Sequence, residues 1–177
     1  MDFQVAILQG RDGGDEVLAA ARTALRLARE ARMQVVHVRV AFTEQDYASV
    51  PDRNKSFAAL AGTRRMADGS PAAEIHPDLA PAAGDIVVTK TRVGAFSTTA
   101  LQTHLAARNI DTLVLTGVAT SGVVLSTLRD AADRDYRLLV LQDCCLDVPE
   151  THAALVSHVF PRQADVIDVP ALANLLR

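Results

Sequence analysis

The stretch LTGVATSGVVLSTLRDAADRDY, residues 115–136, decides the fold, because an apolar run ends in it at Gly117 and an amphipathic run begins a few residues later. The run Thr112–Thr116 (TLVLT) has the length and β-branched content of a buried strand. The run Ser121–Arg134 has apolar residues at helical spacing. In an open parallel sheet, ligands bind beyond the carboxyl ends of strands, where helix amino ends direct free N–H groups. This strand-to-helix turn is therefore the expected floor of a binding site.

Further apolar runs on either side of this stretch predict five more strands. They are Gln4–Leu8, Gln34–Val40, Asp85–Thr89, Arg137–Leu141 and Ala164–Val169. Helical spacing predicts Glu16–Arg32, which Asp15 can cap, Thr99–Arg108, Pro149–Val159 and a short helix from Pro170. Six strands separated by helices predict a three-layer α/β/α sandwich, Rossmann-like, with a six-stranded parallel sheet. With 177 residues the chain is the size of one domain, so we expect a single unit over residues 1–177.

The segment Ala41–Gly84 interrupts this alternation. Prolines and glycines divide it into turns, with at most one short helix near Ser56–Arg65. So long a connection is either a lid or substrate loop, or an excursion that forms a dimer contact.

The composition excludes several classes of function. A formal net charge of -3 without a dense basic run argues against a nucleic-acid partner. The chain has no glycine-rich phosphate loop, so no nucleotide or other cofactor is predicted. Its apolar runs are too short to span a membrane, and the amino end does not resemble a secretory signal, so we expect a cytoplasmic protein. Adjacent Cys144 and Cys145 fit reduced thiols in that compartment.

Two segments, GDIVVTKTRVGAF (residues 84–96) and NIDTLVLTGVATSGVVLSTLRDAADRDYRLLVLQDCC (residues 109–145), carry a family resemblance. The chain resembles the isochorismatase-like (cysteine hydrolase) superfamily. The resemblance implies a six-stranded sheet of order 3-2-1-4-5-6, a homo-oligomer, and a small-molecule ligand in the crevice at the carboxyl ends of the strands. It implies hydrolysis of amides, ureides or, in the isochorismatase branch, a vinyl ether.

The family's amide hydrolases use an Asp after the first strand, a Lys after the third and a Cys at the start of the helix after the fourth. The carboxylate takes the thiol proton, the ammonium stabilises charge, and the thiolate attacks the carbonyl. Lys90 falls on the Lys position and Phe96 on the aromatic that follows it. Gln9 falls on the Asp position and Val123 on the Cys position, and neither side chain can perform the family's step. The chain therefore resembles a divergent member without the catalytic Cys and Asp.

The isochorismatase branch also lacks the Cys and uses the Asp as proton donor, which Gln9 cannot replace. If the alignment shifts, the nearby acids are Asp2 before the predicted strand and Asp12 in the turn after it, and Asp12 is the candidate. The resemblance places the ligand against Phe96 and the turn residues Val118, Ala119, Thr120, Ser121 and Gly122. It also implies a cis peptide between Val118 and Ala119.

Each polar residue of this region has a structural alternative. Ser121 is either a stand-in nucleophile or a helix N-cap, and the Thr120 hydroxyl either enters the site or satisfies the turn. Cys144 and Cys145, expected just after the fifth strand, either direct a thiol into the crevice or fill the core.

The five histidines show no metal-binding spacing. Nicotinamidase relatives carry an Asp-x-His after the second strand, which VRVAFTEQD lacks; a pairing of Asp46 with His76 is a remote alternative, and no metal is predicted. Two functions remain open. One is hydrolysis through a non-standard set of residues, with Lys90 either stabilising charge or acting as the acid, and Gln9 orienting substrate or water. The other is a catalytically inactive binding or structural homologue that has kept the pocket.

Overall fold

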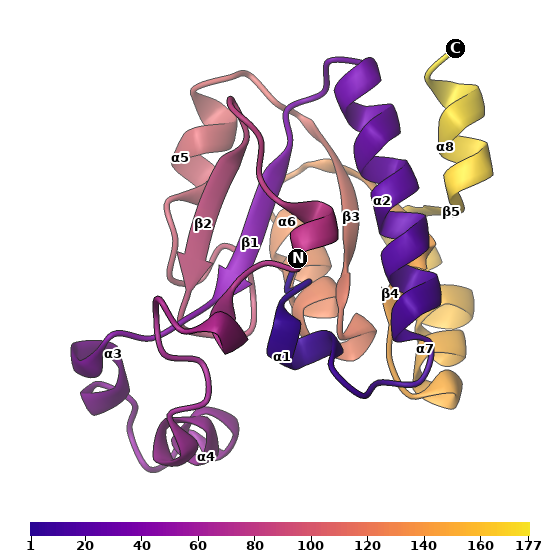
Figure 1. Cartoon of the computed structure of the whole chain (residues 1–177). Helices are drawn as coiled ribbons and strands as arrows, with labels where there is room; N and C mark the ends of the chain where they lie inside the picture. Colours follow the sequence, from indigo (N-terminus) through magenta and orange to yellow (C-terminus); the bar gives the residue numbers. More distant parts are fainter.

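A computed structural model describes residues 1–177 as parallel strands covered by helices on both faces (Figure 1). The strands are β1 (Val36–Val40), β2 (Ile86–Lys90), β3 (Thr112–Val118), β4 (Arg137–Leu146) and β5 (Asp165–Ile167). The α-helices are α1 (Val5–Leu8), α2 (Gly14–Glu30), α3 (Glu44–Ala48), α4 (Lys55–Thr63), α5 (Leu101–Ala106), α6 (Leu125–Ala132), α7 (Pro149–Ala154) and α8 (Val169–Leu175). π-Helical turns at Thr120–Val124 and Leu155–Val159 extend α6 and α7, and short 3₁₀ turns lie at Pro71–Ala73, Pro77–Leu79 and Phe160–Arg162. The predicted α/β class is confirmed.

The strands form two parallel sheets instead of one. β1 pairs with β2, and β3 pairs with β4, which pairs with β5. Five of the six predicted strands are present in this arrangement. The prediction of a strand over Gln4–Leu8, the first in chain order, is wrong, because Val5–Leu8 forms the short helix α1. The order 3-2-1-4-5-6 is therefore interrupted at the place of its first strand.

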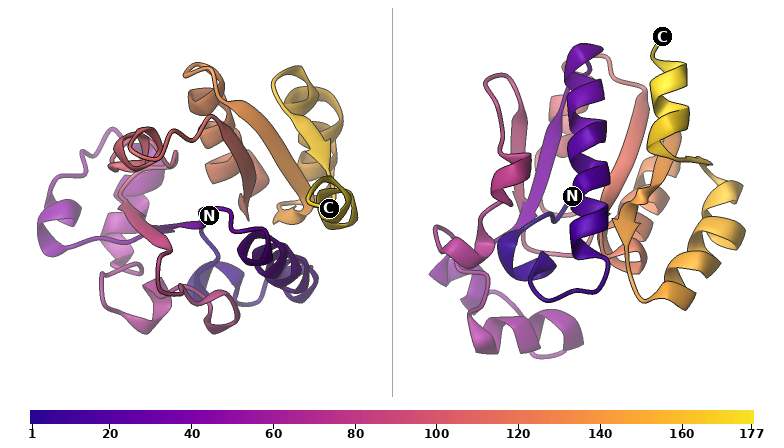
Figure 2. Two further views of the ribbon diagram at one scale, coloured as in Figure 1. Left: turned by 90° about the horizontal axis from the view of Figure 1, so that it is seen from above. Right: turned by 45° about the vertical axis from the view of Figure 1, so that its right-hand side comes forward.

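The first residues of the chain lie between the two sheets (Figure 2, left). The Asp2 N–H donates to the Val38 carbonyl at 2.8 Å, and the Met1 amino group donates to the Thr116 carbonyl at 3.1 Å. The Val118 N–H donates to the Met1 carbonyl at 3.2 Å. A few residues thus connect β1 to β3, although no backbone bond joins the two strands directly.

The core has one part on each face of the strands. One part packs β-strand residues such as Val38, Val88 and Val140 against α5 and α6. The other packs Leu141 and Cys144 against α2 and α8, which lie together on one side in Figure 1. Each element therefore buries an apolar face, as its periodicity predicts.

Helix α2 begins at a glycine turn and not at the predicted Asp15 cap. Gly13 has a φ of 78°, in the left-handed region that glycine adopts without steric cost, and it precedes the first helical residue, Gly14. A Cβ on Gly13 would lie 3.1 Å from the Leu146 side chain. Asp15 lies in the first turn of the helix, where its carboxylate favours the helix dipole.

The segment 41–84 folds around its own small core, formed by Phe42, Tyr47, Phe57 and Met66 among others. The short helix predicted near Ser56–Arg65 is confirmed as α4. The expectation of at most one helix in the segment is wrong, because α3 and two 3₁₀ turns also form there. Whether the segment closes over a ligand or contacts a second copy stays a prediction. No helix of the chain is long and apolar enough to cross a membrane.

Candidate active site

A crevice of about 320 Å³ opens at the carboxyl ends of β1, β2 and β3. Its floor includes Asp2, Lys90 and the turn residues Ala119, Gly122 and Val123. Its walls come from α1 and the turn after it, from α4 and from the segment after α4; they include Ile7, Arg11, Phe57, Leu60, Arg65 and Met66. The strand-to-helix turn is thus part of the floor of a pocket that polar and apolar side chains share.

A buried ion pair joins Asp2 and Lys90. The Lys90 Nζ lies 2.8 Å from Asp2 Oδ2, and the two residues are 2% and 6% exposed respectively. Nζ also donates to the Arg92 carbonyl at 3.2 Å. The second Asp2 oxygen, Oδ1, is buried and has no hydrogen-bond partner. The pair therefore presents an unsatisfied acceptor within a residue that lines the crevice.

The protonation of Asp2 reflects two opposing causes. Burial raises the pKa of the Asp2 carboxyl because desolvation disfavours the charged form, and the nearby Lys90 ammonium lowers it by less. Asp2 also has a φ of 57°, a left-handed conformation that aspartate tolerates better than most residues. The raised pKa makes this carboxyl group a better proton donor than an exposed aspartate, and it lies in a pocket, so Asp2 is a candidate general acid.

Gln4 holds the segment that carries Asp2. Its side-chain amide donates to the carbonyls of Val40 at 2.8 Å and Ala73 at 2.6 Å, and its oxygen accepts from the Val40 N–H at 2.8 Å. Gln4 is fully buried. These bonds fasten the chain to the end of β1, so that Asp2 reaches Lys90 at the end of β2.

The turn after β3 contains the predicted cis peptide, between Val118 and Ala119. The hydroxyl groups of Thr120 and Ser121 in this turn are bonded to residues outside the crevice. The fully buried Thr120 places Oγ1 2.9 Å from His152 Nδ1, and the Ser121 hydroxyl donates to Asp147 Oδ2 at 2.6 Å. Ser121 is not the predicted N-cap, since it lies inside the π-helical turn. Neither residue lines the crevice, whereas Val123 does and is only 2% exposed.

Three other residues expected at the site lie away from it. The expectation that Gln9 ends a strand is wrong, because Gln9 is exposed at the carboxyl end of α1, and Asp12 is exposed in the turn that follows. Neither residue lines the crevice. Phe96 is buried in the core, where the Arg134 guanidinium lies 4.9 Å from its ring centre.

Asp2, which the sequence offered only as a nearby acid, is the carboxylate that meets Lys90. The sequence does hold one relevant pattern: Asp2 and Gln4 lie just before the apolar run Val5–Leu8. The structure buries both residues. Taking that run as a strand moved the acid position seven residues along the chain, to Gln9. A short apolar run such as Val5–Leu8 fits a strand and a helix equally well, so the sequence pattern alone does not place the acid at Asp2.

The two cysteines are buried and belong to the core. Both lie inside β4, so the expectation that they follow a strand is wrong. Burial raises the pKa of the Cys145 thiol to about 12, and burial with the nearby Asp143 carboxylate raises that of Cys144 further. Neutral thiols are poor nucleophiles.

The possible metal ligands are dispersed. No group of three or more His, Cys, Asp or Glu side chains lies within reach of one ion. Asp46 accepts bonds from Thr43 at the start of α3, and His76 accepts the Asp78 N–H. Each therefore has a local structural partner.

The fold and the crevice define a parallel α/β protein with a carboxylate and an ammonium buried at the strand ends. The chain belongs to the isochorismatase family, whose domain model matches residues 1–171. It is 30% identical to maleamate amidohydrolase of Pseudomonas putida over 82% of this chain and 62% of that protein. It is 34% identical to the ureidoacrylate amidohydrolase RutB of Methylobacterium radiotolerans over 93% of this chain and 69% of that protein. The chain thus spans about two thirds of the length of these relatives.

Two solved structures have folds similar to that of this chain. An isochorismatase family protein of Desulfovibrio vulgaris matches with a TM-score of 0.88 and 27% identity, over 99% of this chain and 94% of that chain. N-carbamoylsarcosine amidase of Thermoplasma acidophilum matches with a TM-score of 0.78 and 25% identity, over 95% and 92%.

Proposed function

We propose that the protein is a hydrolase of a small molecule in which Asp2 transfers the proton and Lys90 stabilises the negative charge. The observation that carries this proposal is the buried Asp2–Lys90 pair with an unpartnered Asp2 oxygen. Burial raises the pKa of the Asp2 carboxyl above its ordinary value in spite of the Lys90 ammonium, and a raised carboxyl pKa is typical of a general acid. In this proposal Asp2 supplies the acid that Gln9 cannot provide.

The side chain at Val123 favours one class of substrate over another. Attack on an amide or ureide through a covalent intermediate needs a nucleophile, which Val123 cannot provide. Hydrolysis of a vinyl ether needs a proton on the alkene carbon and then water on the resulting cation, with no bond to the protein. As water adds to the cation it gives a proton back to Asp2. The hemiketal that results then breaks its bond to the ether oxygen, which leaves as an alcohol with the hydroxyl proton, while the carbon becomes a carbonyl. We therefore propose a vinyl ether as the first substrate class, with amides and ureides attacked directly by water as the second.

Two arginines in the crevice support a negatively charged substrate. Arg11 and Arg65 both line it, and neither forms an ion pair in the structure. A guanidinium binds a carboxylate through two parallel hydrogen bonds. We propose that a carboxylate of the substrate binds to these residues.

A catalytically inactive binding protein is the second candidate, and the observation that favours it is Val123 itself. In this alternative the crevice binds the same anionic small molecule without converting it. The homo-oligomer and the cytoplasmic location that the family implies stay predictions, and light scattering of the purified protein would test the first.

The test is a screen of isochorismate, maleamate, ureidoacrylate and N-carbamoylsarcosine with the purified chain. If turnover is found, Asp2→Asn should lower kcat/KM by about 10²–10⁴-fold, the usual contribution of a general acid. Asp12→Asn is the matched control, because Asp12 is an exposed acid outside the crevice. An unchanged kcat/KM in Asp2→Asn would exclude the proposed role. Saturable binding without turnover would favour the inactive alternative.

A further inference from the structure

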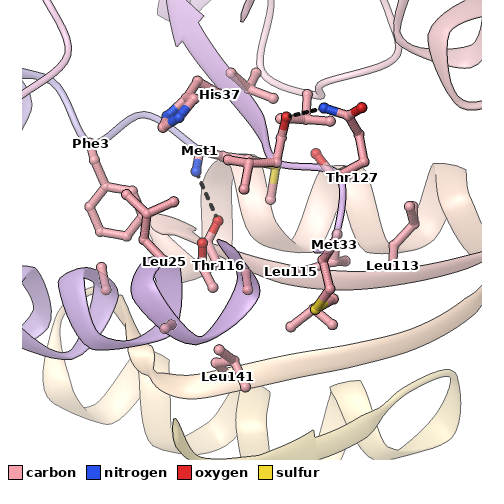
Figure 3. A pocket seen from close by; sticks show the side chains of 18 of the residues that line it. Met1, Phe3, Leu25, Met33, His37, Leu113, Leu115, Thr116, Thr127 and Leu141 are labelled. Carbon is pink, nitrogen blue, oxygen red and sulfur yellow. Dashed lines mark hydrogen bonds between the residues drawn. The ribbon is translucent and has the colours of Figure 1, made fainter. Parts of the chain in front are cut away.

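A second hollow, of about 210 Å³, separates the two sheets. Figure 3 shows it from close by, with Met1 and Phe3 near one end and Leu113 and Leu115 along one side. Of its 25 lining residues, 20 are hydrophobic, so its occupant must be apolar. We call this hollow the slot; it is lined by β1, β3, α2 and α5, and by Met1, Phe3 and their neighbours.

The two strands that face the slot have unpaired edges. β1 pairs only with β2, and β3 pairs only with β4. The carbonyls of Val38 and Thr116 point into the slot, since they accept the N–H groups of Asp2 and Met1. By the alternation of strands, the backbone groups of Val36 and Val114 point the same way. Val36 and Val114 are half-buried, and no strand pairs with this side of β1 or β3, so an extended chain in the slot would give their backbone groups partners.

Met1 and Asp2 define the direction and register of that occupant. They are bonded to β1 on one side and to β3 on the other, as a central strand would be. The Met1 amino group points back along the slot at the level of Thr116. On the slot side, no strand pairs with the preceding β3 residues, Thr112–Leu115. About five extended residues, at roughly 3.3 Å each, would reach the start of β3.

The Met1 amino group argues for a covalent connection. Burial lowers its pKa from 8.0 to about 6, because the apolar surroundings disfavour the ammonium. An amide nitrogen at the same point would carry no charge and could make the same bond to Thr116.

We propose that the slot is the acceptor site for one apolar strand of about five residues that is continuous with Met1, parallel to β1 and β3, and paired with both. With that strand in place, the two sheets become one. The side chains on its two faces would pack on α2 and on α5, and both faces must be apolar, as in a central parallel strand. This proposal concerns the fold and is independent of the proposed hydrolase activity.

The experiment adds the residues Val-Leu-Val-Leu-Val directly before Met1, after a short Ser-Gly leader. We expect a higher urea midpoint than that of the chain as described. Slower amide exchange is expected at Val38 and Val114, whose N–H groups face the slot, and not at Leu115, which faces β4.

Two controls separate filling of the slot from other effects. Acetylation of Met1 removes the charge and leaves the slot empty, and should give a smaller increase in the midpoint. A matched extension with proline at the central position keeps the length but loses one N–H and disturbs the ladder on both sides. It should leave the amide exchange of Val38 and Val114 unchanged.

The proposal is overturned if the apolar extension gives no more stability than acetylation, or if the proline extension protects the same amides. Two further outcomes would also overturn it. One is equal stabilisation by the same five residues added as a free peptide at equimolar concentration, which would indicate a separate partner. The other is a molecular mass that doubles only in the extended chain, which would indicate a strand exchanged between copies.

Discussion

Replacing Lys90 by methionine should destabilise the protein by an amount that grows with pH. Methionine preserves most of the apolar stem of Lys90, so the main change is loss of the ammonium that lies 2.8 Å from Asp2. Removing one partner of a buried ion pair typically costs 3–5 kcal/mol, because the other charge stays buried. Asp2 can reduce this cost by taking up a proton.

The free energy needed to protonate Asp2 sets the size of the destabilisation. The reference pKa of the Asp2 carboxyl is 3.8 in the unfolded chain. Holding it protonated in the folded variant costs about 1.4 kcal/mol for each pH unit above that value. The free energy of unfolding should therefore fall by at most about 4 kcal/mol at pH 7 and by less than about 2 kcal/mol at pH 5, because the wild type already bears part of this cost through the raised pKa of its Asp2. The sign follows from linkage: the folded variant holds a proton that the unfolded chain releases, so stability is present at low pH and is lost as pH rises.

Urea unfolding of the wild type and of Lys90→Met at pH 5, 6 and 7 measures this difference. The double variant Asp2→Asn/Lys90→Met is the control, since it lacks both charges of the pair, and the pH-dependent loss of stability expected for Lys90→Met should be absent from it. An equal loss in Lys90→Met at pH 5 and pH 7 would refute the reasoning, because it would show that Asp2 does not take up a proton.

Three further predictions concern residues that shape the fold. Gln4→Met should lower the free energy of unfolding by about 3 kcal/mol or more, because it removes three buried hydrogen bonds of the Gln4 side chain to the backbone of Val40 and Ala73, and urea unfolding would show it. Gly13→Ala should lower the melting temperature through a cost of about 1 kcal/mol, since Gly13 has a φ of 78°, whereas Gly62→Ala in open helical space should not destabilise. Cys144 and Cys145 should react with a thiol reagent at pH 8 only as fast as the protein opens, because both are buried and the pKa of Cys145 is about 12; fast stoichiometric labelling of the folded protein would contradict this.

Local periodicity was sufficient for most of the elements. Five of the predicted strands and the major helices appear within a few residues of their expected bounds. Such runs depend on which residues face the core, and that pattern can be recognised in a linear sequence. Boundaries were less certain: β4 continues to Leu146, because its pairing with β3 resumes after an irregularity near Gly117.

Among the site residues predicted from the motif around Lys90 and from the turn after β3, those that line the crevice are Lys90, Ala119, Gly122 and Val123, whereas Val118, Thr120 and Ser121 do not line it. Their positions follow from the strands before them, which bring their carboxyl ends to one edge of the fold. Phe96 shows the limit of this approach, since its position in the motif did not reveal that its ring faces the core and Arg134.

The sequence by itself determined the α/β class, the alternation of strands and helices, the family and the turn at which the crevice opens, because each depends on residues close together in the chain. Only the tertiary structure decided that Val5–Leu8 is helical, since the bonds of Gln4 to Val40 and Ala73 turn the chain there. It alone placed Asp2 against Lys90, and it alone revealed the slot between β1 and β3. These features depend on contacts between segments tens of residues apart, whose pairing no local pattern specifies.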